Sequence, residues 1–236
     1  MLLASCVSTQ KVVYFQEVAG VEVQENITIF EPKVQIGDLL NINVSAIDAA
    51  AVIPFNLYES TGVGTPKPID YLVNTDGEIN FPVVGKVKVE GATTKQITTN
   101  LTKTLRNYLK NPIVNIRVTN FRVTVLGEVK VPGTYTIQNE RISIIEAIGL
   151  AGDLTIQGKR TTVLLVREQE GKRQFITMDL TNKKLFNSPY YYLAQNDVIY
   201  IEPNKAKINS SAVGTNAGII ISSVSALISL IAILTR

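Results

Sequence analysis

The sequence contains no histidine and no tryptophan, and it has a single cysteine, Cys6. Without histidine the commonest general base of enzymes is missing, so Ser-His-Asp and Cys-His catalysis are excluded. A zinc site built from cysteine and histidine is excluded as well. These absences favour binding, structure or transport over catalysis, and we expect neither a bound metal nor a cofactor.

Charge is scarce and nearly balanced. The chain of 236 residues has 23 basic and 20 acidic residues, which gives a formal net charge of +3. The basic residues are scattered, and no stripe of lysine or arginine alternates with aromatic residues, so a nucleic acid partner is not expected. Hydrophobic residues make up 45% of the chain, which is enough material for a globular core.

Small and apolar residues directly precede the single cysteine in the run Leu2-Leu3-Ala4-Ser5-Cys6. This run is similar to a lipobox, where bacterial lipoproteins are cleaved and lipidated, so Cys6 is the predicted lipidation site. A stray cysteine is the alternative. A secretory signal needs a basic region and an apolar region of about 7–15 residues. Because only five residues precede Cys6, either the true start codon lies upstream or the signal has been removed from this sequence.

Residues 217–235 carry no charge and are rich in Ile, Leu, Val and Ser. A helix of that length would be about 28 Å long, close to the ~30 Å thickness of a hydrocarbon core. We therefore expect a transmembrane helix here, joined to the body of the chain by a polar linker over 204–216. A plain single-span anchor and a buried helix of a soluble core are the alternatives.

The small residues of this predicted helix share one stripe at about 100° per residue. The stripe consists of Gly218, Ser222, Ser225, Ala226 and Ser229. Larger apolar residues lie opposite, among them Leu227, Ile228 and Ile231. Small and hydroxyl side chains suit close helix packing in lipid, and they equally suit the wall of a water-filled pore.

Residues 31–120 are predicted to form a first domain of the α+β class. Apolar side chains alternate over 40–44, the pattern of a half-buried strand. Thr93 and Gln96 have the capping-box spacing that begins a helix, and the pair Asn111-Pro112 is expected to end it.

Residues 121–203 are predicted to form a second, β-grasp-like domain. After a strand over 121–125, the run Val131-Pro132-Gly133 is expected to form a type II turn with a positive φ at the glycine. Ser143 and Glu146 form another capping box before a short helix. Further strands are expected at 162–166, 173–178 and 198–201.

Several polar and aromatic motifs are candidate functional sites. Gly37-Asp38 is interpreted as a turn with a solvated or capping carboxylate. A glycosidase needs two carboxyl groups about 5–10 Å apart. The candidate carboxylates are Asp76, Glu78, Glu128, Glu146, Asp153 and Asp197. Most of these stand beside glycine or in predicted turns, which favours a structural role. The rings of Tyr190, Tyr191 and Tyr192 could stack on sugars, and a strand with surface hydroxyls is the alternative.

Several of these stretches occur in an order that resembles the outer-membrane polysaccharide export family. In the first domain the matching stretches are 34–40, 71–85 and 109–114. In the second domain they are 125–129, 132–135, 146–153, 188–189 and 196–201. The resemblance covers about 170 residues with several motifs in the right order, which makes it more specific than any single motif.

The resemblance implies a polysaccharide export domain over 31–120 and a soluble-ligand-binding β-grasp (SLBB) domain over 121–203. A signal remnant at 1–6 and an N-terminal extension at 7–30 would precede them. It further implies a homo-oligomeric ring, octameric in the best-known type, that exports capsular or extracellular polysaccharide through the Gram-negative outer membrane. Members work with an inner-membrane polysaccharide copolymerase, and most of the chain would lie in the periplasm.

Two functions follow as hypotheses. The first is a non-enzymatic subunit of such an export channel. The second is a periplasmic carbohydrate-binding or adaptor lipoprotein that is only tethered to the membrane. The predicted helix over 217–235 favours the channel, because an adaptor anchored at Cys6 has no need of a second attachment.

Overall fold

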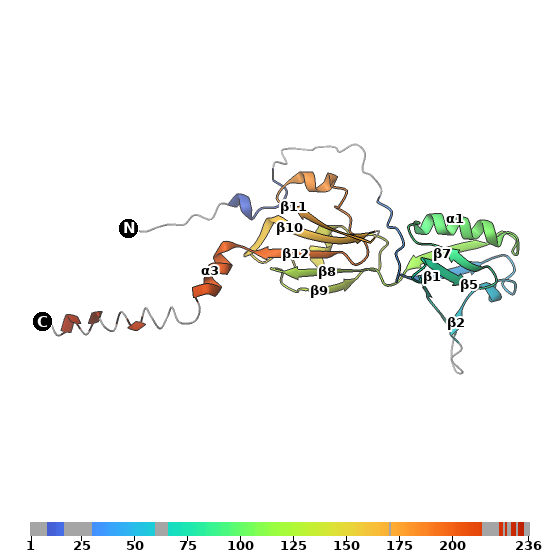
Figure 1. Ribbon diagram of the computed structural model, residues 1–236, viewed down its shortest axis with the longest axis horizontal. Helices are drawn as coiled ribbons and strands as arrows, with labels where there is room; N and C mark the ends of the chain where they lie inside the picture. Colours follow the sequence, from blue (N-terminus) through green and yellow to red (C-terminus); the bar gives the residue numbers. More distant parts are fainter. Residues whose placement is uncertain are drawn as a thin grey trace.

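The computed structural model describes residues 9–16, 30–59, 66–169, 171–213, 222–223, 225, 228–229 and 231–233. Two α+β domains lie end to end along the long axis of the molecule (Figure 1). Each has its own buried hydrophobic cluster, and Val118 packs against both clusters. The predicted fold class is thus confirmed for the body of the chain.

The first domain is built around a three-stranded antiparallel sheet in the order β4-β1-β7. Its strands are β1 (Leu39–Ser45), β4 (Tyr71–Leu72) and β7 (Ile113–Val118). Two hairpins, β2 (Tyr58–Glu59) with β3 (Lys67–Pro68) and β5 (Glu78–Phe81) with β6 (Gly85–Lys88), complete the domain together with η2 (Ile53–Phe55). The helix α1 (Thr94–Leu105) packs beside β7 (Figure 1).

The helix α1 begins as predicted but ends earlier. Thr93 and Gln96 make both hydrogen bonds of the capping box. The expected end at Asn111-Pro112 is wrong, because the helix stops at Leu105 and the chain continues in tight turns that bury Leu109. Asn111 has a φ of +51°, so the backbone has left the helical region before the proline restricts it.

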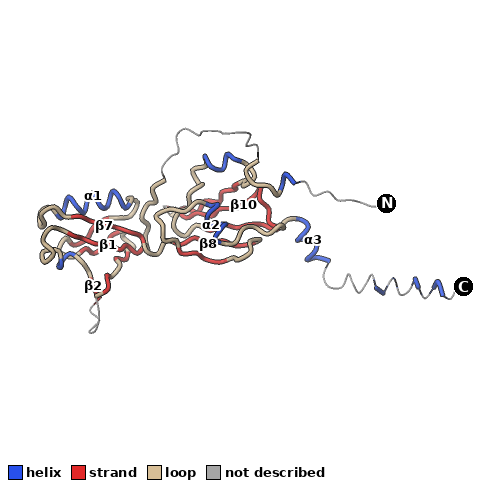
Figure 2. The backbone as a smooth tube through the Cα atoms, turned by 180° about the vertical axis from the view of Figure 1, so that it is seen from behind, coloured by secondary structure: helices blue, strands red, loops and turns tan. Residues whose placement is uncertain are grey.

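The second domain contains a five-stranded sheet in the order β11-β10-β12-β8-β9. The strands are β8 (Arg122–Gly127), β9 (Gly133–Thr136), β10 (Gly158–Gln169), β11 (Lys172–Met178) and β12 (Val198–Pro203). β8 and β12 run parallel at its centre, and the other pairs are antiparallel. The capped helix α2 (Ile144–Leu150) packs against the sheet (Figure 2), and η3 (Lys183–Asn187) follows β11. This order agrees with the β-grasp-like plan.

The turn expected at Val131-Pro132-Gly133 is wrong. Gly133 does not have a positive φ, and it is the first residue of β9. The glycine with a positive φ between β8 and β9 is instead Gly127, the last residue of β8, with a φ of +91°. A Cβ atom there would lie 2.0 Å from the carbonyl oxygen of Ile201, because β8 and β12 approach closely at that point.

The two ends of the described chain lie at the same end of the molecule, away from the first domain (Figures 1 and 2). Near the N-terminus, η1 (Thr9–Lys11) contacts β10. The stretch 204–216 is not only a linker, because Asn204 caps the helix α3 (Lys205–Val213) directly after β12. No helix among the described residues is long and apolar enough to cross a membrane.

Candidate functional site

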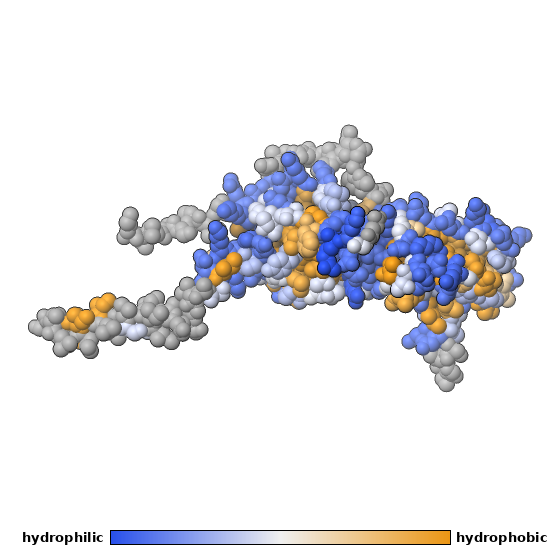
Figure 3. Space-filling view, in the orientation of Figure 1, coloured by the Kyte–Doolittle hydropathy of each residue, from blue (hydrophilic) through white to orange (hydrophobic). Residues whose placement is uncertain are grey.

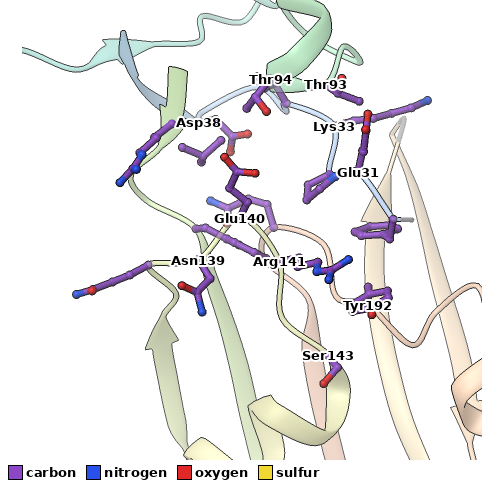
Figure 4. Close-up of a pocket in the computed structure, with 18 of the residues that line it drawn as sticks. Glu31, Lys33, Asp38, Thr93, Thr94, Asn139, Glu140, Arg141, Ser143 and Tyr192 are labelled. Atoms are coloured by element: carbon purple, nitrogen blue, oxygen red, sulfur yellow. The ribbon is translucent and has the colours of Figure 1, made fainter. Parts of the chain in front are cut away.

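A cavity of about 930 Å³ lies between the two domains. The first domain contributes the segment 30–34, Asp38, the start of α1 and Arg117. The second domain contributes the loop 138–141 and the pair Tyr191-Tyr192. Figure 4 shows Asp38 of the first domain and Glu140 of the second domain facing one another across the cavity. Its volume lies within the range of small-molecule binding pockets, which makes it the candidate site.

One part of the wall is aromatic. The rings of Tyr192 and Phe30 are stacked, with centroids 5.9 Å apart and an interplanar angle of 15°. Tyr191 meets Tyr192 edge-on at 5.0 Å. The guanidinium of Arg141 lies 5.1 Å from the centre of the Tyr192 ring, a cation–π distance.

The three tyrosines predicted from the sequence therefore divide into two groups. Tyr191 and Tyr192 line the cavity, and their backbone is fixed because Ile144 donates a hydrogen bond to the carbonyl oxygen of Tyr191. Tyr190 faces elsewhere: its ring lies 5.5 Å from the guanidinium of Arg167 and its hydroxyl contacts Gln174. The expectation of a plain surface strand is wrong, since these residues form turns and an isolated bridge.

The remaining wall is polar and contains both hydrogen-bond donors and acceptors. Lys33 comes from the first domain, and Asn139 and Glu140 come from the loop of the second domain. Within the described residues, these three side chains make no hydrogen bond or ion pair with the protein. Their polar groups are thus available to a ligand in the cavity.

Asp38 is the most buried polar residue of the site, with 2% of its surface exposed. Its Oδ2 atom accepts a hydrogen bond of 2.8 Å from the backbone amide of Gln35. Its Oδ1 atom is buried and has no hydrogen-bond partner among the described residues. Burial raises the pKa of Asp38, and the hydrogen bond from the Gln35 backbone amide partly opposes that rise. Of the two expected roles for this carboxylate, solvated or capping, the structure shows the capping one.

A hydrogen-bond network joins the two domains beneath the cavity. Asn120 accepts a hydrogen bond from the backbone of Leu39 and donates one to the carbonyl oxygen of Gly37. The carbonyl oxygen of Asn120 accepts a 2.8 Å hydrogen bond from Gln195, whose own oxygen accepts one from the backbone of Arg122. The network therefore fixes the turn that carries Asp38 relative to the second domain.

Most of the candidate carboxylates named from the sequence have structural partners. Glu128 accepts a hydrogen bond from Thr155, and Glu146 belongs to the capping box of Ser143. Asp197 is fully buried and forms an ion pair of 2.6 Å with Arg167. Burial raises the pKa of Asp197, and the contacts with Arg167 oppose that rise. Among the described residues, no group of His, Cys, Asp or Glu side chains could hold a metal ion.

Residues 9–16 contact the second domain through hydrogen bonds and a cation–π interaction. The Tyr14 hydroxyl donates a hydrogen bond to Asp153, and the Arg160 guanidinium lies 5.2 Å from the Tyr14 ring. The backbone of Phe15 donates a hydrogen bond to the carbonyl oxygen of Leu180. Burial, followed by the hydrogen bond to Asp153, raises the pKa of the Tyr14 hydroxyl. Cys6, the predicted lipidation site, lies outside the described residues.

Only part of the small-residue stripe near the C-terminus falls within the described residues. Ser222, Ser225 and Ser229 are helical and exposed, whereas Gly218 and Ala226 lie outside the description. The Ser229 hydroxyl donates a hydrogen bond of 2.9 Å to the backbone carbonyl oxygen of Ser225, one turn earlier. This hydroxyl can therefore be satisfied within its own helix.

Sequence reasoning did not find most of the cavity. Lys33, Lys95 and Arg117 are far apart along the chain, and none belongs to a recognisable motif. The one local signal is the polar run Asn139-Glu140-Arg141 between buried apolar residues at 137 and 142. A charged loop there could have been identified as an exposed feature of the second domain.

Comparison with known proteins agrees with this two-domain structure. Residues 30–119 match the family described as "Polysaccharide biosynthesis/export protein", and residues 121–201 match the SLBB domain. A stretch of 79 residues is 38% identical to the "EPS I polysaccharide export outer membrane protein EpsA" of Ralstonia solanacearum. The EpsA protein of Ralstonia nicotianae is 37% identical over the same length. Each match covers 32% of this chain and 21% of the relative, so the chain spans about a fifth of the length of the curated relatives it matches.

Proposed function

We propose that this chain, which belongs to the polysaccharide biosynthesis/export family and has an SLBB domain, is one subunit of an oligomeric outer-membrane export channel. The main support for this proposal is the order of the two domains. Residues 30–119 match the export family, and residues 121–201 match the SLBB domain. The family is one of export proteins rather than enzymes. The cargo is capsular or extracellular polysaccharide.

The positions of the two chain ends support this assignment. The segment 9–16, which follows Cys6, is fastened to the SLBB domain, and α3 leaves the same end of that domain towards 217–235 (Figure 1). A lipid at Cys6 and a membrane-spanning helix at 217–235 would thus attach the same end of the molecule to the outer membrane. The export domain would then extend away from it into the periplasm, towards an inner-membrane copolymerase.

Apolar side chains exposed on the export domain support the proposed ring. Ile47, Ile53, Leu72 and Ile113 are each at least 60% exposed. Figure 3 shows hydrophobic surface on this end of the molecule. Surface of this kind commonly marks protein contacts, and we assign it to neighbouring subunits of a homo-oligomer, octameric by family analogy.

The second candidate function is a carbohydrate-binding or adaptor lipoprotein in the periplasm. The cavity between the domains favours it, because a binding protein needs a site but no pore. The two functions differ in what they require of residues 217–236. A channel subunit needs this segment in order to export, whereas a lipid-anchored adaptor does not.

The test replaces the chromosomal gene with a version that lacks residues 217–236. The channel assignment predicts that surface polysaccharide is lost, while the truncated protein accumulates and its two domains resist limited proteolysis as in the full chain. The matched control carries Ile228→Leu in the full-length chain, which keeps an apolar side chain outside the small-residue stripe, and should export normally. Normal export from the truncated strain would contradict the channel assignment and favour the adaptor.

A further inference from the structure

We propose that the cavity between the export and SLBB domains binds pyranose units of the exported polysaccharide, an assignment that rests on the proposed function. The unpartnered polar groups of the cavity carry this inference. Asp38 is 2% exposed and has a buried oxygen without a hydrogen-bond partner among the described residues. Such a group normally has a partner, which a ligand hydroxyl in the cavity would supply.

Acceptors from both domains point into the same space. Figure 4 shows the Glu140 side chain reaching from the SLBB domain towards Asp38 of the export domain. Lys33 and Asn139 add donors at the cavity wall. A sugar hydroxyl both donates and accepts hydrogen bonds, so a ring with several hydroxyls can satisfy donors and acceptors on opposite walls together.

The aromatic wall complements these polar groups. Tyr191 and Tyr192 come from one turn of the SLBB domain, and Phe30 stacks on Tyr192 from the export side. A pyranose ring has apolar C–H faces and polar edges, so it can contact aromatic and charged walls at once. Ligand pockets commonly combine such an apolar lining with a few polar groups that fix orientation.

The charges of the lining indicate how the sugar is held. Four Lys or Arg side chains and four Asp or Glu side chains line the cavity, so their formal charges cancel. A site that captured a polyanion by charge alone would instead carry an excess of basic residues. We therefore assign recognition to hydrogen bonds and ring contacts, and we expect affinity to change little with ionic strength.

The experiment measures binding to the full-length protein in lipid nanodiscs. The probes are oligosaccharides of a few sugar units, made by partial hydrolysis of the exopolysaccharide of the source bacterium. The variant Asn139→Ala/Glu140→Ala should weaken binding about tenfold or more in isothermal calorimetry, because it removes two ligand-facing groups. Lys33→Ala changes the opposite wall and should weaken binding as well. These exposed side chains make no hydrogen bond or ion pair with the protein, so the variants should fold.

The matched control is Glu59→Ala/Asn107→Ala, which changes exposed residues of the export domain away from the cavity. It should bind like the wild type. Equal affinity of the cavity variants and the wild type would overturn the proposal, and so would a lack of binding by the wild type. An affinity that falls steeply with added salt would also overturn it, because such a result indicates that basic side chains bind an anionic polymer by charge alone.

Failure of this inference can be distinguished from failure of the proposed function. If removing residues 217–236 abolishes surface polysaccharide while the purified full-length protein binds none of the fragments, the channel assignment holds and the cavity assignment falls. If export survives the removal of residues 217–236, the channel assignment falls whatever the binding result. The two measurements use the same strain and the same polysaccharide.

Discussion

Gly127 illustrates how a single residue can be required by two independent features of the fold. Its φ of +91° suits glycine, and an added Cβ atom would lie 2.0 Å from the carbonyl oxygen of Ile201. Strain of this kind costs about 1–3 kcal/mol before the backbone contact is counted. The parallel pairing of β8 with β12 depends on the same approach.

Gly127→Ala is therefore expected to lower the free energy of unfolding by about 2 kcal/mol or more. Gly149→Ala is the matched control, because Gly149 lies inside α2 with no atom within 4 Å of an added Cβ. That control should raise the free energy of unfolding by about 0.5–1 kcal/mol through helix propensity. Urea denaturation followed by circular dichroism measures both. Equal effects of the two substitutions would contradict the close approach of β8 and β12.

The buried carboxyl group of Asp38 makes stability depend on pH. Burial raises its pKa in the folded state, so the folded protein holds this proton more tightly than the unfolded chain. The associated stabilisation is complete below the ordinary aspartate pKa of about 3.9 and is lost as the pH rises through the higher folded value. At neutral pH, the ionised group therefore destabilises the fold relative to a neutral one.

Asp38→Asn keeps an acceptor for the Gln35 amide and removes the charge. The variant should have a higher free energy of unfolding than the wild type at pH 7, and the difference should shrink as the pH falls towards about 4. The control Asp48→Asn changes an exposed carboxylate and should alter the free energy by less than about 0.5 kcal/mol. Denaturation at a series of pH values measures the effect. The prediction would be contradicted if Asp38→Asn were less stable than the wild type at pH 7. That result would mean that the folded protein stabilises the ionised carboxylate.

At the scale of the elements, local signals predicted the structure well. Both capping boxes, at Thr93 and at Ser143, occur where the sequence placed them. The failures lie where tertiary contacts override local preference. Leu109 turns inward instead of continuing α1, and the close approach of β12 places the positive φ at Gly127 rather than Gly133. The cavity could not be predicted, because its walls come from residues separated by about 100 positions in the chain.

The described serines near the C-terminus allow a test of the predicted pore helix. Ser225 belongs to the stripe of small residues, and Leu227 belongs to the opposite apolar face. Backbone groups are satisfied within each helix, so a ring of such helices can span a membrane. If the stripe faces a water-filled lumen, water reaches Ser225, whereas lipid covers Leu227.

Ser225→Cys should therefore react with a membrane-impermeant thiol reagent in assembled channels, and Leu227→Cys should be protected. The thiol of Cys6 is blocked by its lipid under the same assignment, so it does not compete. Labelling is measured by the mass shift of the purified protein. Equal labelling at both positions would leave the segment as a plain anchor without a lumen face.

For the whole molecule, the contacts of Tyr14 and the start of α3 lie at one end, where we propose both membrane attachments. The Tyr14 hydroxyl contacts Asp153, and α3 continues directly from β12. Two attachments on one end make each other partly redundant for anchoring, because either alone holds the same face against the bilayer. Stable anchoring in general takes more than one weak signal, although a spanning helix suffices by itself.

This redundancy predicts the result of membrane fractionation. Cys6→Ser should stay in the membrane fraction through 217–235, and the version lacking residues 217–236 should stay through lipidated Cys6. Only the combination should release the protein into the periplasmic fraction. Because the truncation begins after α3 ends at Val213, the released protein should keep both folded domains and its Tyr14 contact. If Cys6→Ser alone were released, residues 217–235 would not be inserted in a membrane, and the tethered adaptor would become the better assignment.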